Sequence, residues 1–375
     1  MKRKEKKVAI ISRESDSKTL DVAMLEEELL KRGVRVKVLS KLLTKEKSIR
    51  ALGYLGHVMK QEAAILASDV VVLDTYCIPA SMIPHRKGTK VIQMWHALGA
   101  IKKFGWQTVG KEGGSSAKTA RSMRMHHGYD FVTCASDVTA EHFCEAFKVS
   151  RNKIAKYGLP RIDYVKSVAV GSRRDETAAK ILAKYPQLKS EKQTILYAPT
   201  FRRGKAVDVK SLADALDSDR FDLVVKLHPL YRANTAGQED SSGSIIYDEA
   251  FSSYDWLSVA DIIISDYSSL VIEATLADKP LYIYAYDLEE YEANTGLNVD
   301  FTKEPIAKYV YRDAGELAKA VSDISGSDRK GLAAQTEKTA EAAYDLSALR
   351  AFRDRYIDID TDNCTVALAD FIESL

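Results

Sequence analysis

The chain of 375 residues lacks long apolar runs and has only four cysteines. No stretch approaches the roughly 20 apolar residues that a membrane-spanning helix requires. The cationic opening MKRKEKK leads directly into an alternating strand pattern, which excludes a signal peptide. The cysteines show neither a CxxC pair nor a paired Cys/His spacing, so we expect neither a zinc site nor a disulfide framework. These absences predict a cytoplasmic protein with buried free thiols.

Neither sign of charge dominates the composition. The chain has 55 Lys and Arg against 53 Asp and Glu, a net charge of +2. This balance excludes the basic excess of a dedicated nucleic-acid-binding protein. One local basic stretch, SSAKTARSMRMHHG at residues 115–128, ends in His126 and His127. It predicts either a solvated surface or a surface that faces anionic lipid.

Short apolar runs separated by helical patterns predict an α/β fold. KVAIIS at 7–12 has the pattern of a strand, 19–32 that of an amphipathic helix stopped by Gly33, and VRVKVLS that of a second strand. Further buried-strand candidates lie in 67–76, 88–99 and 129–136. Such a succession is typical of a doubly wound parallel sheet.

The same alternation of strand and helix patterns starts again in the second half, after a polar stretch at 157–174. New strand candidates lie in QTILYAPTF, FDLVVKLHP, SGSIIYDE and ADIIISD, and helical patterns follow at 314–324 and 337–355. We therefore expect two Rossmann-like domains, residues 1–165 and 166–350, with 351–375 crossing back to the first. This alternation of strands and helices is shared by nucleotide-sugar transferases, periplasmic-type binding proteins and two-domain dehydrogenases. No GxGxxG motif follows any predicted strand, which disfavours the dehydrogenases.

The turn SDYSS, residues 265–269, is the strongest local signal for a ligand. It follows the β-branched run at 262–264 and precedes helical spacing from Leu270. Hydroxyls and backbone N–H groups at the start of a helix suit a phosphate, which predicts binding by Ser265, Asp266, Ser268 and Ser269. The alternative is that Asp266 or Ser268 only caps the helix.

Three other strand ends are also polar, and ligands of parallel sheets collect at the carboxyl ends of strands. WHALGAIKKFG places His96 after one strand, with Gly99 permitting a close backbone approach. The other two ends supply the remaining candidates: Thr200 and Arg202 after YAP, and Lys226, His228 and Pro229 in KLHP.

The two histidines occupy equivalent positions, one in each half. Across a cleft they would serve a reaction that needs a proton acceptor and a group that stabilises phosphate charge. Arg202 can hold phosphate oxygens bidentately and Lys226 can act as a point charge. Each of these residues has a structural alternative, such as a hydrogen-bonded histidine. The acidic IDIDTDN near the C-terminus fits a strand or a capped turn better than a metal site, so we expect no metal and no cofactor.

Five motifs in order, WHALGAIKKFG, GLPRID, YAPTFR, KLHP and SDYSSLVIEATLADKPLYIY, resemble the CDP-glycerol glycerophosphotransferase family of teichoic-acid primases and polymerases. The resemblance spans about residues 91–300. It implies the GT-B fold of two Rossmann-like domains facing each other across a cleft, with the CDP-alditol held mainly by the second.

The resemblance also implies roles for the candidate residues. His96 is the expected general base and His228 the other essential residue, which stabilises the diphosphate together with Arg202 and Lys226. Ser268 and Ser269 are expected to hold the pyrophosphate. Glu273 is expected either to reach the ribose hydroxyls or to face solvent.

Two departures from the family pattern concern the acceptor. The first motif has the short primase-like form, and Thr295-Gly296 stands where an Arg-Gly pair is expected. The implied reaction transfers an alditol phosphate, glycerol phosphate before ribitol phosphate, to a lipid-linked saccharide at the inner face of the cell membrane. The basic stretch would then contact anionic lipid. A GT-B glycosyltransferase or capsule synthase using a nucleotide sugar and a non-catalytic nucleotide- or sugar-binding module remain the alternatives.

Overall fold

The computed structural model describes residues 5–42, 49–111, 114–202, 205–227, 245–324 and 344–375. His228 and Pro229 therefore lie outside the described residues. The chain forms two compact units. The first unit comprises Met1–Asp163, Asn294–Asn298 and Arg355–Leu375, and the second comprises Tyr164–Ala293 and Val299–Asp354.

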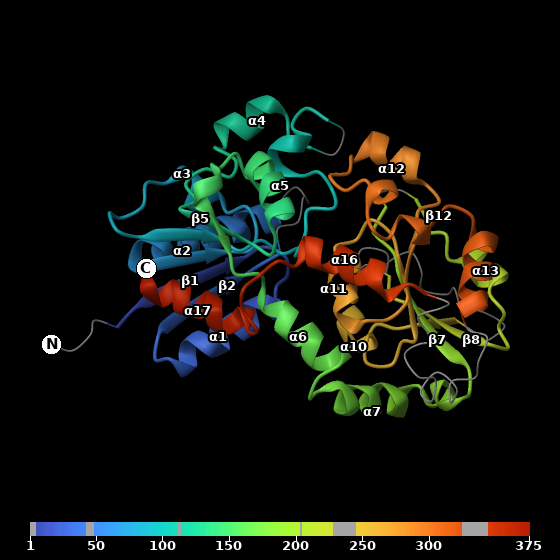
Figure 1. Cartoon of the computed structure of the whole chain (residues 1–375). Helices are drawn as coiled ribbons and strands as arrows, with labels where there is room; N and C mark the ends of the chain where they lie inside the picture. Colours follow the sequence, from blue (N-terminus) through green and yellow to red (C-terminus); the bar gives the residue numbers. More distant parts are fainter. Residues whose placement is uncertain (1–4, 43–48, 112–113, 203–204, 228–244, 325–343) are drawn as a thin grey trace. The chain divides into compact units, whose positions relative to one another are not determined.

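The first unit is built on a six-stranded parallel sheet in the order β2-β1-β3-β4-β5-β6 (Figure 1). The chain moves outward from β1 to β2 and then returns past β1 to β3, so the order reverses between β1 and β3. Open parallel sheets bind ligands outside the carboxyl ends of the strands at such a reversal. The elements are β1 (Lys7–Ser12), α1 (Leu20–Lys31), β2 (Arg35–Ser40), α2 (Ile49–Ala67), β3 (Val70–Leu73), α3 (Ile78–Met82), β4 (Lys90–Gln93), α4 (Ala117–Ser122), β5 (Phe131–Cys134), α5 (Asp137–Phe147), β6 (Ile154–Lys156) and α17 (Cys364–Ser374). Helix α6 (Pro160–Ala169) begins in the first unit and continues into the second.

The C-terminal helix α17 packs beside α1 in the first unit (Figure 1). Helix α1 buries Val22, Leu25 and Leu29 at helical spacing. Arg32 then donates to Glu28 at 2.8 Å and forms ion pairs with two carboxylates of α17. The residues at the end of the chain are therefore part of the first unit's packing.

The second unit also contains a six-stranded parallel sheet, in the order β12-β11-β10-β7-β8-β9. Counted from β7, this is the Rossmann order 3-2-1-4-5-6, and it reverses between β7 and β10. Its elements are α7 (Arg174–Lys184), β7 (Gln193–Ala198), α8 (Lys210–Ala215), β8 (Phe221–Val225), β9 (Ile245–Tyr247), α10 (Ser253–Trp256), β10 (Ile262–Ser265), α11 (Leu270–Ala274), β11 (Leu281–Tyr284), α12 (Leu288–Asn294), β12 (Val310–Tyr311), α13 (Ala314–Ile324) and α16 (Leu346–Tyr356).

The predicted pair of doubly wound parallel sheets is confirmed. Two short strands, β6 and β12, were not predicted because they are only half-buried and lack a long apolar run. The acidic IDIDTDN segment forms no strand, and its Asn363 instead caps α17 by accepting the N–H of Val366 at 2.9 Å. Of the helical pattern predicted at 337–355, residues 337–343 lie outside the described part of the chain. No helix in the described ranges is long and apolar enough to cross a membrane.

Candidate functional site

The sheet reversal of the second unit brings together the YAPTFR and SDYSS motifs. Strands β7 and β10 are neighbours, and Ser265 Oγ at the end of β10 donates to the carbonyl of Ala198 at 2.8 Å. The carboxylate of Asp266 accepts the backbone N–H of Thr200, with its two oxygens at 2.9 and 3.0 Å. Two motifs that are 66 residues apart in sequence are thus locked together where a parallel sheet binds its ligand. Asp266 does not cap the following helix.

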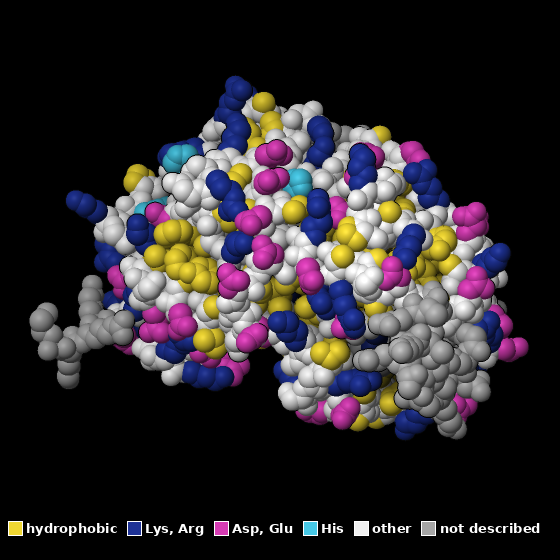
Figure 2. Space-filling view, viewed as in Figure 1, with side chains coloured by type: hydrophobic (Ala, Val, Ile, Leu, Met, Phe, Trp, Pro, Cys, Tyr) yellow, Lys and Arg dark blue, Asp and Glu magenta, His cyan; other side chains and the backbone are white. Residues whose placement is uncertain are grey.

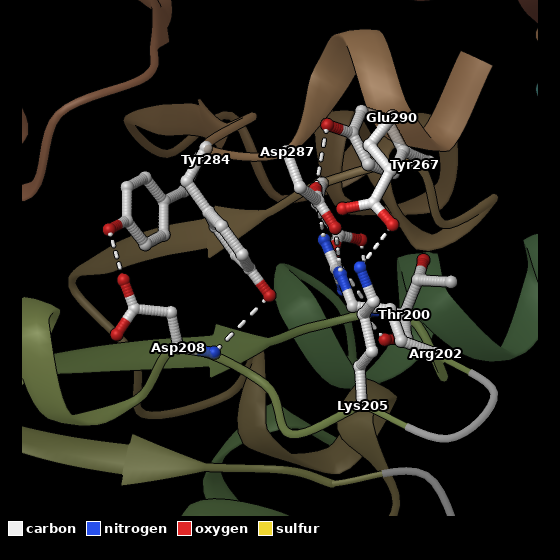
Figure 3. Close-up of polar contacts among 10 residues, drawn as sticks. Thr200, Arg202, Lys205, Asp208, Tyr267, Tyr284, Asp287 and Glu290 are labelled. Atoms are coloured by element: carbon white, nitrogen blue, oxygen red, sulfur yellow. Dashed lines mark hydrogen bonds and ion pairs between the residues drawn. The ribbon is translucent and has the colours of Figure 1, made fainter. Parts of the chain in front are cut away.

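Arg202 lies buried between two carboxylates at this edge (Figure 3). It binds Asp287 through Nε at 2.6 Å and Nη2 at 2.9 Å, while Nη1 donates to Asp266 at 2.7 Å and to the Thr200 carbonyl at 2.8 Å. The Tyr286 ring lies 4.7 Å from the guanidinium carbon. Burial alone would lower the pKa of Arg202, but the two carboxylates raise it above its usual range. The guanidinium is therefore fixed, charged and oriented.

Lys226 follows β8 and is also held by carboxylate and carbonyl oxygens. Its ammonium donates to Asp248 Oδ2 at 2.9 Å, to the Asp248 carbonyl at 2.7 Å and to the Phe251 carbonyl at 2.6 Å. Asp248 also accepts from the Trp256 indole at 2.8 Å and the Tyr185 hydroxyl at 2.7 Å. These bonds lower the pKa of Asp248, although burial opposes them. Lys226 thus anchors the turn after β9.

The hydroxyl turn itself leads into a short helix. Helix α11 has five residues, and a 3₁₀ turn at Thr275–Ala277 continues it. Ser268 Oγ accepts the N–H of Leu270 at 3.3 Å, whereas the side chain of Ser269 makes no capping bond. The carboxyl group of Glu273 is fully buried, with the Tyr254 hydroxyl 3.4 Å from it. The expectation that Glu273 faces solvent is therefore wrong, because all five residues of this short helix are buried.

Two hydroxyls near the same edge have no protein partner among the described residues. They are Thr200 Oγ1 and the Tyr197 hydroxyl, and both are buried. Burying a hydroxyl without a hydrogen bond is unfavourable, so such groups are suited to a ligand. The sequence indicated Thr200 but not Tyr197, since a tyrosine inside a buried strand has the pattern of an ordinary core residue.

The first unit holds His96 in the loop after β4. Its Nδ1 lies 2.8 Å from the carbonyl of Asp74 and 3.7 Å from Oε1 of Glu14. A carbonyl oxygen only accepts, so Nδ1 carries the proton and Nε2 of the neutral ring has a free lone pair. About a third of the side chain is exposed. His96 therefore has the tautomer and access of a general base, and Gly99 lies buried three residues further on.

Trp95 holds this histidine from the preceding position. Its backbone adopts φ 65°, a left-handed conformation that is strained for a bulky residue. Its N–H donates to Gln93 Oε1 at 2.9 Å, and its ring lies 4.1 Å from that of His96. The strain is thus stabilised by a buried glutamine and sets the direction of the His96 side chain.

His126 does not face lipid or solvent, contrary to both expectations for the basic stretch. It is 5% exposed, donates to or accepts from the Tyr129 hydroxyl at 2.9 Å, and packs edge-on against Phe147. Burial lowers its pKa to about 3. The cations of the basic stretch are exposed: Lys118 and Arg121 lie on α4 and Arg124 follows it, and Figure 2 shows dark blue side chains over this helix.

The loop after His96 contacts the segment in which the family pattern is broken. Lys102 pairs with Leu297 in an antiparallel bridge, and the N–H of Lys103 donates to the carbonyl of Gly296 at 3.0 Å. The backbone N–H of Asn298 also donates to the Ile101 carbonyl at 2.8 Å. The two departures seen in the sequence are therefore neighbours in the first unit.

The GLPRID turn has a structural role in the first unit. Asp21 of α1 accepts from the N–H and Nε of Arg161, both at 2.8 Å. Asp163 accepts the first N–H groups of α17, from Cys364 at 2.9 Å and Thr365 at 2.8 Å.

Within the described ranges, no group of three or more His, Cys, Asp or Glu side chains is placed to hold a metal ion.

Residues 1–372 match the model of a family described as CDP-Glycerol:Poly(glycerophosphate) glycerophosphotransferase. The teichoic acid ribitol-phosphate primase of Bacillus spizizenii is 32% identical over 333 residues, which are 86% of this chain and 79% of the relative. The teichoic acid glycerol-phosphate primase of Bacillus subtilis is 28% identical over 325 residues, 85% of this chain and 77% of the relative.

Solved structures with the same fold include the wall teichoic acid polymerase TagF. It has a TM-score of 0.70 at 18% identity, covering 98% of this chain and 88% of that chain. UDP-GlcNAc 2-epimerase from Neisseria meningitidis has a TM-score of 0.60 at 12% identity, covering 99% and 100% of the two chains. At these identities the likeness shows the fold alone, which is the expected GT-B arrangement of two Rossmann-like domains.

Proposed function

Because the chain belongs to the CDP-glycerol:poly(glycerophosphate) glycerophosphotransferase family, we propose that it transfers an alditol phosphate from a CDP-alditol to a hydroxyl of a lipid-linked saccharide, releasing CMP. The relatives named above are teichoic acid primases, and a related polymerase has been solved after soaking with CDPG. The product would be a teichoic-acid-like or capsule polymer. Glycerol phosphate is the first candidate for the transferred group, since the family is described by it.

The observation that carries the mechanism is the contact of His96 Nδ1 with the Asp74 carbonyl. With Nδ1 donating to the Asp74 carbonyl at 2.8 Å, Nε2 is left to accept a proton from the acceptor hydroxyl. The acceptor oxygen forms a bond to the β-phosphorus of the donor, and the bond from that phosphorus to the bridging oxygen breaks. CMP leaves with the bridging oxygen and its electron pair, and His96 later releases the proton to solvent.

The second unit provides the candidate donor site at its sheet reversal. Thr200 presents a buried hydroxyl beside Asp266 and Arg202 that has no partner in the described part of the chain. Ser268 and Ser269 are proposed to hold the pyrophosphate, and Glu273 to reach the ribose hydroxyls. Arg202, Lys226 and His228 are proposed to stabilise the diphosphate charge, and Pro229 is proposed to belong to the same substrate-binding site. Arg202 and Lys226 are already held in place by carboxylates, so their charged groups need no reorganisation when the donor binds.

His96→Ala tests the central role of the histidine. A general base typically contributes about 10²- to 10⁴-fold in rate, so we expect a loss of that size with unchanged binding of CDP-glycerol. Transfer to a synthetic lipid-linked disaccharide is measured by mass, and donor binding by calorimetry. His142→Ala is the matched control, because His142 lies half-buried on α5 of the same unit. Wild-type turnover by His96→Ala would refute the proposed role.

CDP-ribitol is the second candidate donor, and one observation favours it. The relative with 32% identity over 333 residues is a ribitol-phosphate primase. Incubating the enzyme with each CDP-alditol, and with a UDP-sugar as a negative control, decides between the donors by the mass added to the acceptor. Addition from the UDP-sugar alone would overturn the proposal in favour of a glycosyltransferase.

We also propose that the enzyme works in the cytoplasm, at the inner face of the cell membrane. A lipid-linked acceptor requires contact with that surface. The exposed cations around α4, Lys118, Arg121 and Arg124, are suited to anionic lipid.

A further inference from the structure

Three loops meet at the carboxyl edge of the first unit's sheet. Strands β1, β3 and β4 lie side by side and parallel, so the residues that follow them leave the sheet at one edge. Glu14 follows β1, Asp74 follows β3 and His96 follows β4. Glu14 and Asp74 therefore flank the reversal between β1 and β3, which is the position that open sheets use for ligands.

Asp74 is the unusual member of this group. Its carboxyl group is 1% exposed, and among the described residues neither of its oxygens has a partner with good hydrogen-bond geometry, although the Ser12 and Thr75 hydroxyls lie near it. Burial raises its pKa to about 6, an effect that Glu14 increases and that Ser12 and His96 oppose. Burying a carboxyl group in this way costs folding free energy, and carboxyl groups with shifted pKa values concentrate at functional sites.

Glu14 approaches His96 from the neighbouring loop. Its Oε1 lies 3.7 Å from Nδ1 of His96, and the backbone N–H of Glu14 donates to Ser12 Oγ at 3.3 Å. The distance is too long for a strong hydrogen bond but suits an ion pair once the imidazole is charged. The chain thus places one partly exposed and one buried carboxyl group beside the same ring.

We propose that Glu14 and Asp74 are positioning residues for His96, which together stabilise the imidazolium formed when His96 takes the acceptor proton. This inference rests on the proposed function of His96 as general base. The Asp74 carbonyl fixes the tautomer, and the two carboxylates supply negative charge as positive charge develops on the ring. The proton stays on His96 and neither carboxyl group accepts it.

Other charged and titratable groups around the ring do not supply this negative charge. His126 lies in the aromatic cluster next to Trp95, and its burial keeps it neutral. Arg13, between Ser12 and Glu14, donates to the Tyr76 carbonyl and faces the Tyr76 ring at 5.7 Å. Glu14 and Asp74 are therefore the acidic groups that we expect to act on His96.

The test measures kcat and KM for the CDP-alditol donor from pH 5 to 9 in Glu14→Gln, Asp74→Asn and the double variant. Outer partners of metal-binding histidines are typically worth about 10- to 100-fold, and by analogy we expect a kcat loss of about tenfold for Glu14→Gln and somewhat more for Asp74→Asn. The donor KM should not change. The acidic limb of the rate profile should move to lower pH, because His96 loses its proton more readily without the carboxylates.

Glu27→Gln is the matched control, since Glu27 is an exposed carboxylate on α1 of the same unit. Wild-type kcat and a wild-type acidic limb in the Glu14 and Asp74 variants would overturn the inference. If the wild-type enzyme transfers no alditol phosphate, the proposed function itself fails. If the wild type is active and His96→Ala is inactive while the carboxyl variants match the wild type, only this inference fails.

Discussion

Asp74 illustrates how a single side chain can lower the stability of the fold and serve the reaction. An ordinary Asp pKa of 3.8 rises to about 6 in the folded chain because the carboxyl group is buried. Ionising it in the folded protein therefore costs up to about 3 kcal/mol relative to the unfolded chain. Below pH 4 the group is protonated in both states and the cost disappears. The free-energy cost of ionising Asp74 grows as the pH rises from 3.8 to about 6.

Asp74→Asn should therefore stabilise the protein at neutral pH. We expect its free energy of unfolding to exceed that of the wild type by up to about 3 kcal/mol at pH 8, and the difference to vanish near pH 4. Urea unfolding across this pH range measures it. Asp137→Asn is the control with the opposite sign, because a hydrogen bond from Lys156 lowers the pKa of the exposed Asp137. A pH-independent difference for Asp74→Asn would contradict the expectation.

The sequence singled out candidate residues where they follow a buried strand. His96, Thr200 and Asp266 were found because an apolar run stops abruptly at a polar residue. Glu14 and Asp74 satisfy the same criterion but were not singled out, since nothing local shows that β3 lies beside β1. The buried ion pair between Arg202 and Asp287 joins residues 85 apart in sequence, and only the fold reveals it.

At the scale of elements, the loop that carries His96 is fixed at its far end by Gly105. This residue has φ 56°, and a Cβ atom there would lie 2.3 Å from the Ala146 carbonyl oxygen at the end of α5. The 3₁₀ turn Gly105–Thr108 begins at this contact. The close packing of the turn on α5 thus sets where the loop ends.

Gly105→Ala should destabilise the protein by about 3 kcal/mol and lower the transfer rate, because the turn must move away from α5. Gly33→Ala is a matched control: Gly33 has φ 75°, but nothing lies within 4 Å of its Cβ position, so only the backbone strain of about 1 kcal/mol applies. Urea unfolding and transfer assays measure both variants. Equal losses in the two variants would show that the contact with Ala146 is unimportant.

Elements with strong apolar runs were predictable from the sequence, and the order of strands was not. Strand β1 was expected at residues 7–12 and lies at Lys7–Ser12, because its residues are buried on both faces. Strand β12 has two residues, both half-buried, so it leaves no pattern. The contact of Gly296 with the loop after His96 has no local signal either, because it depends on the chain returning to the first unit.

At the scale of the whole molecule, the small net charge of +2 hides an uneven surface. The face shown in Figure 2 mixes cations and anions over most of its area, with cations standing out over α4. Such a patch attracts an anionic membrane surface over about a Debye length, an attraction that salt weakens.

Replacing Lys118, Arg121 and Arg124 with Gln should weaken binding to anionic liposomes by up to about 100-fold, since each cation near the surface contributes about 1 kcal/mol. Co-sedimentation with liposomes of anionic and of neutral lipid measures the change. The matched control replaces three exposed lysines from other helices, Lys31, Lys180 and Lys210. Equal binding of the wild type to both lipids would contradict the expectation.

The return of Asn294–Asn298 to the first unit limits how this enzyme can be recombined with its relatives. The chain changes units after Asp163, Ala293, Asn298 and Asp354, so neither unit is a single stretch of sequence. A hybrid joined only at residue 163 would combine the His96 loop of one parent with the Gly296 segment of the other. Domain exchange aimed at a new acceptor should therefore carry residues 294–298 and 355–375 along with the first unit.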